Sequence, residues 1–219
     1  MSLNEQRCLV SMQKEIKEYK RSRIIQEASK LFYERGFEAT SVDMLANELG
    51  VTKPFIYSYF TNKRAILEAV HEQSATRLLG YIKKAVEANG SPEDRLRDFV
   101  QVFVDENIKH QIASGIYLQE EKNLSPIILE RVRDTERAFN RLLAQLIQEG
   151  IETQAFHSTD AKLASLCISG MIRWVHRWYS PEGRLTAHEI IEEIAELGMN
   201  LVGYHEQSHH RRSVRLTSS

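Results

Sequence analysis

The residues best suited to binding chemistry are hydroxyl, phenol and ammonium groups gathered between residues 52 and 63. The polar members fall on the outer faces of a short expected helix, and they are Thr52, Lys53, Tyr57, Ser58 and Tyr59. The phenols, the Lys63 ammonium and free backbone N–H groups at helix starts are donors that hold phosphate oxygens. The segment therefore has the chemistry of a helix that reads the DNA major groove.

Catalytic and metal-binding patterns are absent from the sequence. There is no HExxH, GxGxxG, P-loop or GxSxG motif, and His188-Glu189 lacks a second histidine at the required spacing. Only His205, His209 and His210 cluster, and a solvated tail explains them best. We expect a protein that is not an enzyme and that binds neither metal nor cofactor.

Three helices must position the polar segment. Apolar residues recur at helical spacing from Glu15 until Gly36, which predicts one amphipathic helix of about five or six turns. A second helix is expected over 41–49, with Thr40 and Asp43 capping its start, and it ends at Gly50. The third, over 52–60, begins with Thr52 as a cap and Pro54 in the first turn. The pair forms a helix-turn-helix, although a helical hairpin that only packs a core has the same pattern.

The same residues carry a family resemblance. Residues 24–42 read IIQEASKLFYERGFEATSV and residues 43–67 read DMLANELGVTKPFIYSYFTNKRAIL. This run resembles the DNA-binding module of the TetR family without a gap. Pro54-Phe55 departs from the small residues that are usual there, which suggests an atypical operator sequence.

The resemblance implies a transcriptional regulator, usually a repressor, that binds a palindromic double-stranded DNA operator as a homodimer and is weakened by a small ligand. By position, phosphate contacts fall to Thr40, Ser41, Tyr57, Tyr59 and Lys63. Base contacts fall to the start of the third helix, at Thr52, Lys53 and Pro54, with Lys53 the best candidate for guanine. Whether such a regulator represses or activates depends on where its operator lies.

Composition and charge are compatible with this interpretation. The 219 residues carry a net charge of −1, yet residues 1–64 hold 11 Lys/Arg against 8 Asp/Glu, so a slightly basic head precedes an acidic body. The two cysteines are far apart, and neither a secretory signal nor a membrane span is visible. We expect a cytoplasmic protein that does not enter a membrane.

The remaining chain predicts further helices at roughly 62–88, 92–109, 112–121, 125–150, 160–178 and 187–203. The helices between Arg95 and Trp178 should enclose the effector, although most of their bulky residues are equally suited to an ordinary core. The candidates for its pocket are Phe99, Phe103, His110, Tyr117, Phe139, Leu143, Met171, Arg173, Trp174 and Arg177.

The last helix has an unusually wide apolar face, which predicts a second partner in addition to its own core. Its two stripes are Ile190, Ile194, Leu197, Leu201 and Ile191, Ala195, Gly198, Val202. Residues 173–186 resemble a motif of TetR members that respond to acyl-CoA thioesters, although that motif could equally serve the dimer interface. A hydrophobic effector, with acyl-CoA as one class, is expected.

The sequence thus predicts an all-α fold in three parts: a helix-turn-helix domain over 15–63, a helical effector-binding and dimerisation domain over 64–204, and a disordered tail over 205–219. The alternative is a helical adaptor without DNA binding, which explains the amphipathic body but not residues 24–67.

Overall fold

The computed structural model describes residues 3–204, and the tail expected at 205–219 lies outside this range. Within it the secondary structure is helical, as predicted. The elements are α1 (Leu3–Arg35), α2 (Val42–Leu49), α3 (Lys53–Tyr57), α4 (Lys63–Glu87), α5 (Pro92–Lys109), α6 (Gln111–Gln119), the 3-10 turn η1 (Glu121–Asn123), α7 (Pro126–Glu152), α8 (Ala161–Trp178) and α9 (Ala187–Leu201).

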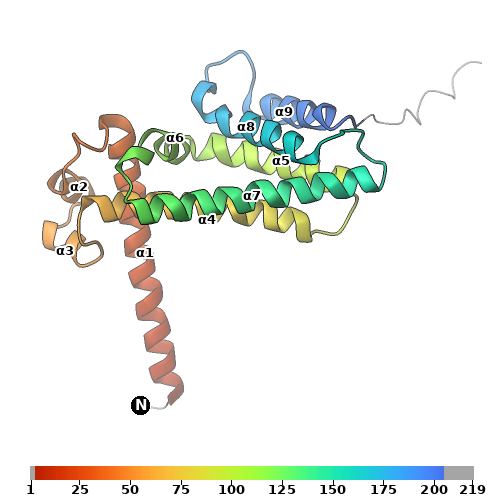
Figure 1. Ribbon diagram of the computed structural model, residues 1–219. Coiled ribbons are helices and arrows are strands. Elements are labelled where there is room, and N and C mark those ends of the chain that lie inside the picture. Colours follow the sequence, from red (N-terminus) through yellow and green to blue (C-terminus); the bar gives the residue numbers. More distant parts are fainter. Residues whose placement is uncertain (1–2, 205–219) are drawn as a thin grey trace, which may run out of the picture.

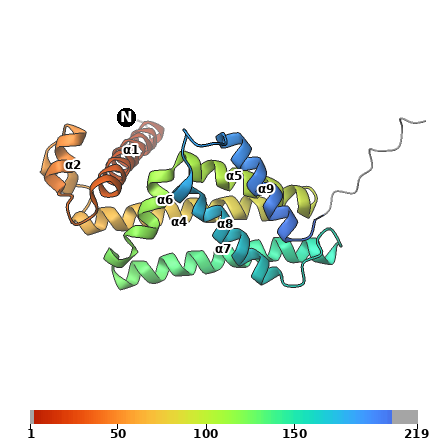
Figure 2. The same ribbon diagram turned by 90° about the horizontal axis from the view of Figure 1, so that it is seen from above.

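The helices form a small head and an elongated body (Figure 1). Helices α2 and α3 lie at one end beside α1, and α4 runs from the head along the body. Helices α5, α7, α8 and α9 pack around α4 and each other, with α8 and α9 on the side seen from above in Figure 2.

Local sequence signals set most helix ends. Thr52 caps α3, Asn62 caps α4, Ser91 caps α5 and Asp160 caps α8, each side chain accepting a hydrogen bond from the first turn. At α9 the predicted capping box forms between Thr186 and Glu189. These ends were predictable because each cap depends on a few neighbouring residues.

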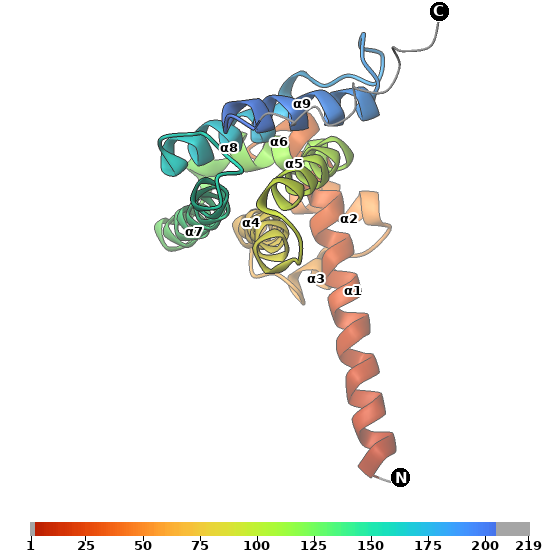
Figure 3. The same ribbon diagram turned by 90° about the vertical axis from the view of Figure 1, so that its right-hand side faces the viewer.

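Helix α1 is longer than expected, because it begins at Leu3 and not near Glu15. Residues 3–35 contain no Gly or Pro to end a helix early. Residues 11–20 are exposed on all sides, and this part of α1 projects away from the body and from α8 and α9 (Figure 3). The predicted helix included Ile16 and Tyr19, which are exposed, whereas the first buried residue among residues 11–35 of α1 is Ile24.

Two apolar cores stabilise the structure. The head core is formed by α1, α2, α3 and α4. It also includes Ile116 and Tyr117 of α6, Leu124 after η1 and Val132 of α7. The body core is built from α4, α5, α7, α8 and α9 around a cluster of Phe99, Phe103 and Phe139. Helix α6 therefore belongs to the head by its packing, although it follows α5 in the chain.

Candidate functional site

The α2–turn–α3 unit presents one polar face to solvent. Gly50 adopts a left-handed conformation, φ +63°, and the Val51 N–H donates to the Ala46 carbonyl, which ends α2 and starts the turn. Ile56 and Phe60 are buried in the head core. Four predicted contact residues lie on the opposite, exposed side, and they are Thr52, Lys53, Pro54 and Tyr57. Ile56 and Phe60 thus lie on the buried side as predicted, whereas Phe55, expected to be buried, and Tyr59, expected to be exposed, are both half-buried.

Lys53 is held in place by the neighbouring helix. Its Nζ lies 2.7 Å from Asp43 Oδ2, and both side chains are exposed. The hydrogen bond and the charge of Asp43 raise the pKa of Lys53, so the lysine stays protonated. The Asp43 carboxylate of α2 therefore orients the Lys53 ammonium, and a DNA base that binds Lys53 must compete with it.

Two predicted phosphate contacts have structural roles in this conformation. Thr40 is 2% exposed, and its hydroxyl donates to the carbonyls of Gly36 at 2.9 Å and Leu31 at 3.2 Å. It does not cap α2 as predicted, because Ser41 accepts from the Met44 N–H. Because its hydroxyl is turned inward, Thr40 is left out of the interface proposed below.

Lys63 is half-buried, and its ammonium donates to the Phe37 carbonyl at 2.6 Å and the Glu38 carbonyl at 3.3 Å. The same ammonium lies 4.2 Å from the centre of the Phe37 ring. Lys63 thus holds the loop between α1 and α2. To contact a DNA phosphate as predicted, its ammonium would have to break the hydrogen bonds to the Phe37 and Glu38 carbonyls.

Tyr59 is also half-buried, with its ring 5.2 Å from that of Phe55. Cations of α1 cover the same aromatic group, with Lys20 above Phe55 at 5.9 Å and Arg21 above the Phe60 ring at 5.0 Å. These two cations were missed because nothing in the sequence shows that α1 crosses α3.

The predicted effector residues separate into three groups. Phe99, Phe103, Phe139 and Leu143 are at most 3% exposed and belong to the body core. Trp174 and Arg177 are exposed, Met171 is half-buried near α9, and His110 lies in a separate groove near α1. Tyr117 and Arg173 line one internal space, and the Phe139 ring lies 4.7 Å from the Arg173 guanidinium beside it.

That space is a cavity of about 30 Å³ between α4, α5, α6 and α8. It is lined by Ser74, Arg77, Leu78, Asn107, Ser114, Tyr117, Arg173 and His176. Its volume is about that of one water molecule in the liquid. In this conformation an apolar chain could enter only if the surrounding helices moved.

Polar groups around the cavity form a network. The carboxylate of Glu136 accepts from the Tyr117 hydroxyl at 2.9 Å and from an Arg173 N–H at 3.2 Å. Burial raises the pKa of Tyr117, so the phenol stays protonated. Asn107 donates to the Ile172 carbonyl and accepts from Ser114, each at 2.8 Å.

Several buried nitrogens at this network have no hydrogen-bond partner among the described residues. They are both ring nitrogens of His71 and the Nε atoms of Arg77 and Arg173. His71 is fully buried, its ring stacks on Tyr117 at 5.3 Å, and desolvation lowers its pKa to about 4. Unsatisfied buried polar groups are costly.

Sequence reasoning missed Ser74, Arg77, Asn107 and Ser114, because α4 and α5 carry many polar residues and nothing in the sequence separates those that turn inward from those that face solvent. The available signal was that such residues must find partners when buried.

Helix α6 connects this network to the head. Tyr117 lines the cavity, and two residues earlier a Cβ on Gly115 would lie 2.5 Å from the Tyr33 ring of α1. At the other end of α6, the Glu120 carboxylate accepts from the Phe37 N–H at 3.2 Å. Helix α6 therefore contacts the cavity, α1 and the loop before α2 at once.

An apolar stripe remains exposed on α8 and α9. It consists of Leu163, Leu166, Trp174, Trp178, Leu197 and Leu201, with exposed fractions from 38% to 58%. Of the two stripes predicted on the last helix, Ile190, Ile194, Ala195 and Val202 are buried within the chain. The α8–α9 face thus supplies the surface available to a second partner.

No helix within residues 3–204 is long and apolar enough to cross a membrane. The same range holds no group of three or more His, Cys, Asp or Glu side chains placed to bind a metal ion.

Comparison with known proteins places both parts of the chain in one class. Residues 24–70 match the family described as bacterial regulatory proteins, tetR family, and residues 89–202 match the tetracyclin repressor-like C-terminal domain. The HTH-type transcriptional repressor KstR2 of Mycolicibacterium smegmatis is 28% identical over 176 residues, which are 78% of this chain and 84% of KstR2.

Solved structures have the same fold. The TetR family regulator PfmR of Thermus thermophilus is 30% identical with a TM-score of 0.75, and the match covers 84% of this chain and 100% of PfmR. AibR, solved in complex with isovaleryl coenzyme A and operator DNA, has a TM-score of 0.72 at 21% identity over 81% of this chain and 96% of AibR.

Proposed function

The chain belongs to the TetR family of transcriptional regulators, and from this premise we propose that it is a dimeric operator-binding repressor released by an amphiphilic small molecule. The observation that carries the proposal is the exposed face of α3, where Thr52, Lys53 and Tyr57 surround a buried Ile56. Repression is proposed from the similarity to the repressor KstR2, and the activator FasR of Mycolicibacterium smegmatis is also similar, at 25% identity over 161 residues.

On DNA, α3 lies in the major groove with Lys53 at base edges. Ser41 and Tyr57 hold phosphates on either side, and Lys20 and Arg21 add positive charge from α1. Because phosphate contacts release counterions, affinity falls steeply as salt rises. A mobility-shift titration with the DNA flanking the gene tests this directly. Binding to no fragment, or binding that ignores salt, would favour the helical adaptor.

Dimerisation uses the α8–α9 face. A two-fold axis through this face places the same surface of each subunit in contact. In such a dimer the two α3 helices, one from each subunit, would bind half-sites that are one DNA turn apart, about 34–36 Å. The open space at Gly170, on the same side of α8 as Leu166 and Trp174, permits close helix approach.

The dimer is tested with one charge on the face and one outside it. Leu166→Glu buries a carboxylate in the interface and should give monomers without operator binding in analytical ultracentrifugation and gel shifts. The matched control is Ile127→Glu on α7, where an equally apolar side chain is 74% exposed away from α8 and α9. A dimeric Leu166→Glu protein would show that another surface forms the interface.

Release follows if the effector favours a conformation that does not fit DNA. A ligand entering the cavity must push α4, α6 and α8 apart, and α6 transmits the movement through Tyr33 and Phe37 to the head. A hundredfold loss of operator affinity requires only about 2.7 kcal/mol of differential binding. An acyl-CoA thioester is proposed because the cationic Arg77 and Arg173 line the cavity beside the apolar core, and because AibR was solved with isovaleryl coenzyme A.

Acyl-CoAs of graded chain length, titrated into the protein–operator complex, test the effector class. Release by one range of chain lengths supports the thioester. Release by a free hydrophobic compound alone would reject the thioester and leave the regulator intact.

A further inference from the structure

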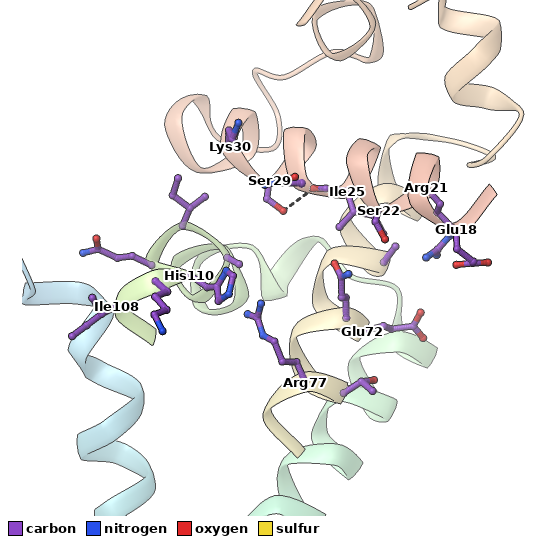
Figure 4. Close-up of a pocket in the computed structure, with 18 residues that line it drawn as sticks. Glu18, Arg21, Ser22, Ile25, Ser29, Lys30, Glu72, Arg77, Ile108 and His110 are labelled. Carbon is purple, nitrogen blue, oxygen red and sulfur yellow. Dashed lines mark hydrogen bonds between the residues drawn. The ribbon is translucent and has the colours of Figure 1, made fainter. Parts of the chain in front are cut away.

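A groove of about 1000 Å³ separates the head from the body on the side of α1. It is lined by Glu18, Arg21, Ser22 and Lys30 of α1, by Glu72 and Arg77 of α4, and by Lys109, His110 and the first residues of α6, among others. In Figure 4 the side chains of Arg77 and His110 point toward each other from opposite walls, with α1 across the opening. The groove is about thirty times larger than the internal cavity.

The charges of this groove favour an anion. Four of its lining side chains are cationic, and they are Arg21, Lys30, Arg77 and Lys109. Lys30 pairs with Glu27 and Lys109 with Asp105, while Arg21 lies over the Phe60 ring, so Arg77 is the cation of the groove for which neither an ion pair nor a ring contact is seen among the described residues. Of its two carboxylates, Glu72 already pairs with Arg131 at 2.8 Å. His110 lies 3.4 Å from Glu106, and burial beside Arg77 lowers its pKa. The first turn of α6 also lines the groove, and no side chain caps it, so its backbone N–H groups are available to an anion.

Arg77 connects the groove to the internal cavity, because it lines both. Its Nε atom is buried without a hydrogen-bond acceptor. A guanidinium in this position offers several donors to a phosphate on one side while its stem borders the space beside Tyr117 on the other. Beyond the cavity, Leu78, Leu79 and Phe139 line a narrower space that also borders Tyr117 and Arg173. An apolar chain that follows an anionic head past Arg77 would therefore pass polar groups first and reach apolar side chains behind them.

We infer that this groove binds the phosphate-bearing part of the effector, with Arg77 as its anchor, while the apolar part enters the cavity behind it. The inference rests on the proposed effector-responsive function. A head group bound here touches α1 and α4 at once, so it acts directly on the angle between the DNA-reading head and the body.

The test compares three probes on the full-length protein by isothermal titration calorimetry without DNA. Octanoyl-CoA carries both parts, coenzyme A carries only the phosphates, and octanoate carries only the chain. We expect Arg77→Gln to weaken octanoyl-CoA binding at least tenfold, to weaken coenzyme A similarly, and to leave octanoate unchanged. Arg77→Lys should recover part of the loss because it retains the charge.

Two further variants at exposed positions show whether a loss of binding reflects the groove or a folding defect of Arg77→Gln. Lys109→Gln removes a second cation of the groove at an exposed position and should weaken octanoyl-CoA by a smaller factor. Arg141→Gln, an exposed arginine of α7 outside the groove, should change nothing. Equal octanoyl-CoA affinity in Arg77→Gln, Lys109→Gln and the parent protein would overturn the inference, as would no binding of octanoyl-CoA to the parent.

A gel shift with the same proteins distinguishes a failure of the groove inference from a failure of the proposed regulator function. If octanoyl-CoA releases DNA equally from the parent and from Arg77→Gln, the groove inference fails and the regulator function stands. If the parent binds no DNA, the proposed function fails, while calorimetry still decides whether the groove holds phosphates.

Discussion

The buried His71 makes the stability of this protein depend on pH in a predictable direction. Its ring is fully buried, and neither nitrogen has a hydrogen-bond partner within the described part of the chain. Desolvation disfavours the imidazolium and lowers its pKa from 6.5 to about 4, although the Glu120 charge opposes this. The unfolded chain therefore takes up a proton at this site at a higher pH than the folded protein does.

The size of the effect follows from linkage. The contribution of His71 is fully present above pH 6.5 and is lost as the pH falls from about 6.5 to about 4. With these two values, lowering the pH from 7 to 5 costs about 2 kcal/mol of unfolding free energy. For a chain of this size, the midpoint of thermal unfolding should fall by about 4–8 °C from this group alone.

The substitution His71→Leu keeps a similar volume and removes the titrating group. Urea unfolding at pH 7 and pH 5, at one protein concentration, should show a loss on acidification that is about 2 kcal/mol smaller in His71→Leu than in the parent. Comparing the change with pH, not the absolute stability, cancels the altered packing against Tyr117. His188→Leu, at a side chain that is 82% exposed, is the control and should behave as the parent does. An equal loss in all three proteins would refute the argument that His71 is neutral in the folded state.

Three further outcomes can be checked independently. Lys53→Ala should reduce the preference for one base at one operator position by about 5- to 150-fold, measured with a panel of single-base operator variants. An equal loss of affinity for every variant would show that Lys53 contacts phosphate instead of a base. Gly150→Ala should destabilise the protein by about 1–3 kcal/mol, because its methyl group would collide with the ring of Phe156, as urea unfolding would show. Gly80→Ala, in open space on α4, should instead stabilise the protein by up to about 1 kcal/mol. If Gly80→Ala lowered the free energy of unfolding as much as Gly150→Ala does, the difference in crowding between the two sites would be refuted.

The head was predictable because its determinants are local. Gly50 ends α2, Thr52 and Pro54 start α3, and the aromatic residues that follow have one buried side, so neighbouring residues alone decide these features. The predicted cap at Thr40 was wrong, because its hydroxyl turns inward to the end of α1, a contact that the sequence does not encode locally. The bonds of Lys63 were missed for the same reason, since its partners Phe37 and Glu38 are about 25 residues away.

The body shows what only tertiary structure decides. Phe99, Phe103 and Phe139 have the sequence pattern of pocket residues, yet they fill the core, because apolar residues at helical spacing serve both purposes equally well. Tyr117 and Arg173 share a cavity only because α6 and α8 are brought together, and Glu136 joins them from α7.

The sequence by itself therefore determined the helical class, the capped helix starts and the exposed polar face of α3, all of which depend on contacts within a few residues. The start of α1 at Leu3 and the end of α3 at Tyr57, expected near Glu15 and residue 60, were not determined in this way. Nor could the sequence determine the groove at Arg77 or the polar network behind it. Their members come from helices far apart in the chain, and their burial and missing partners exist only after packing. Local hydrogen bonds and periodicity are properties of a segment, whereas a cavity is a property of the space left between segments.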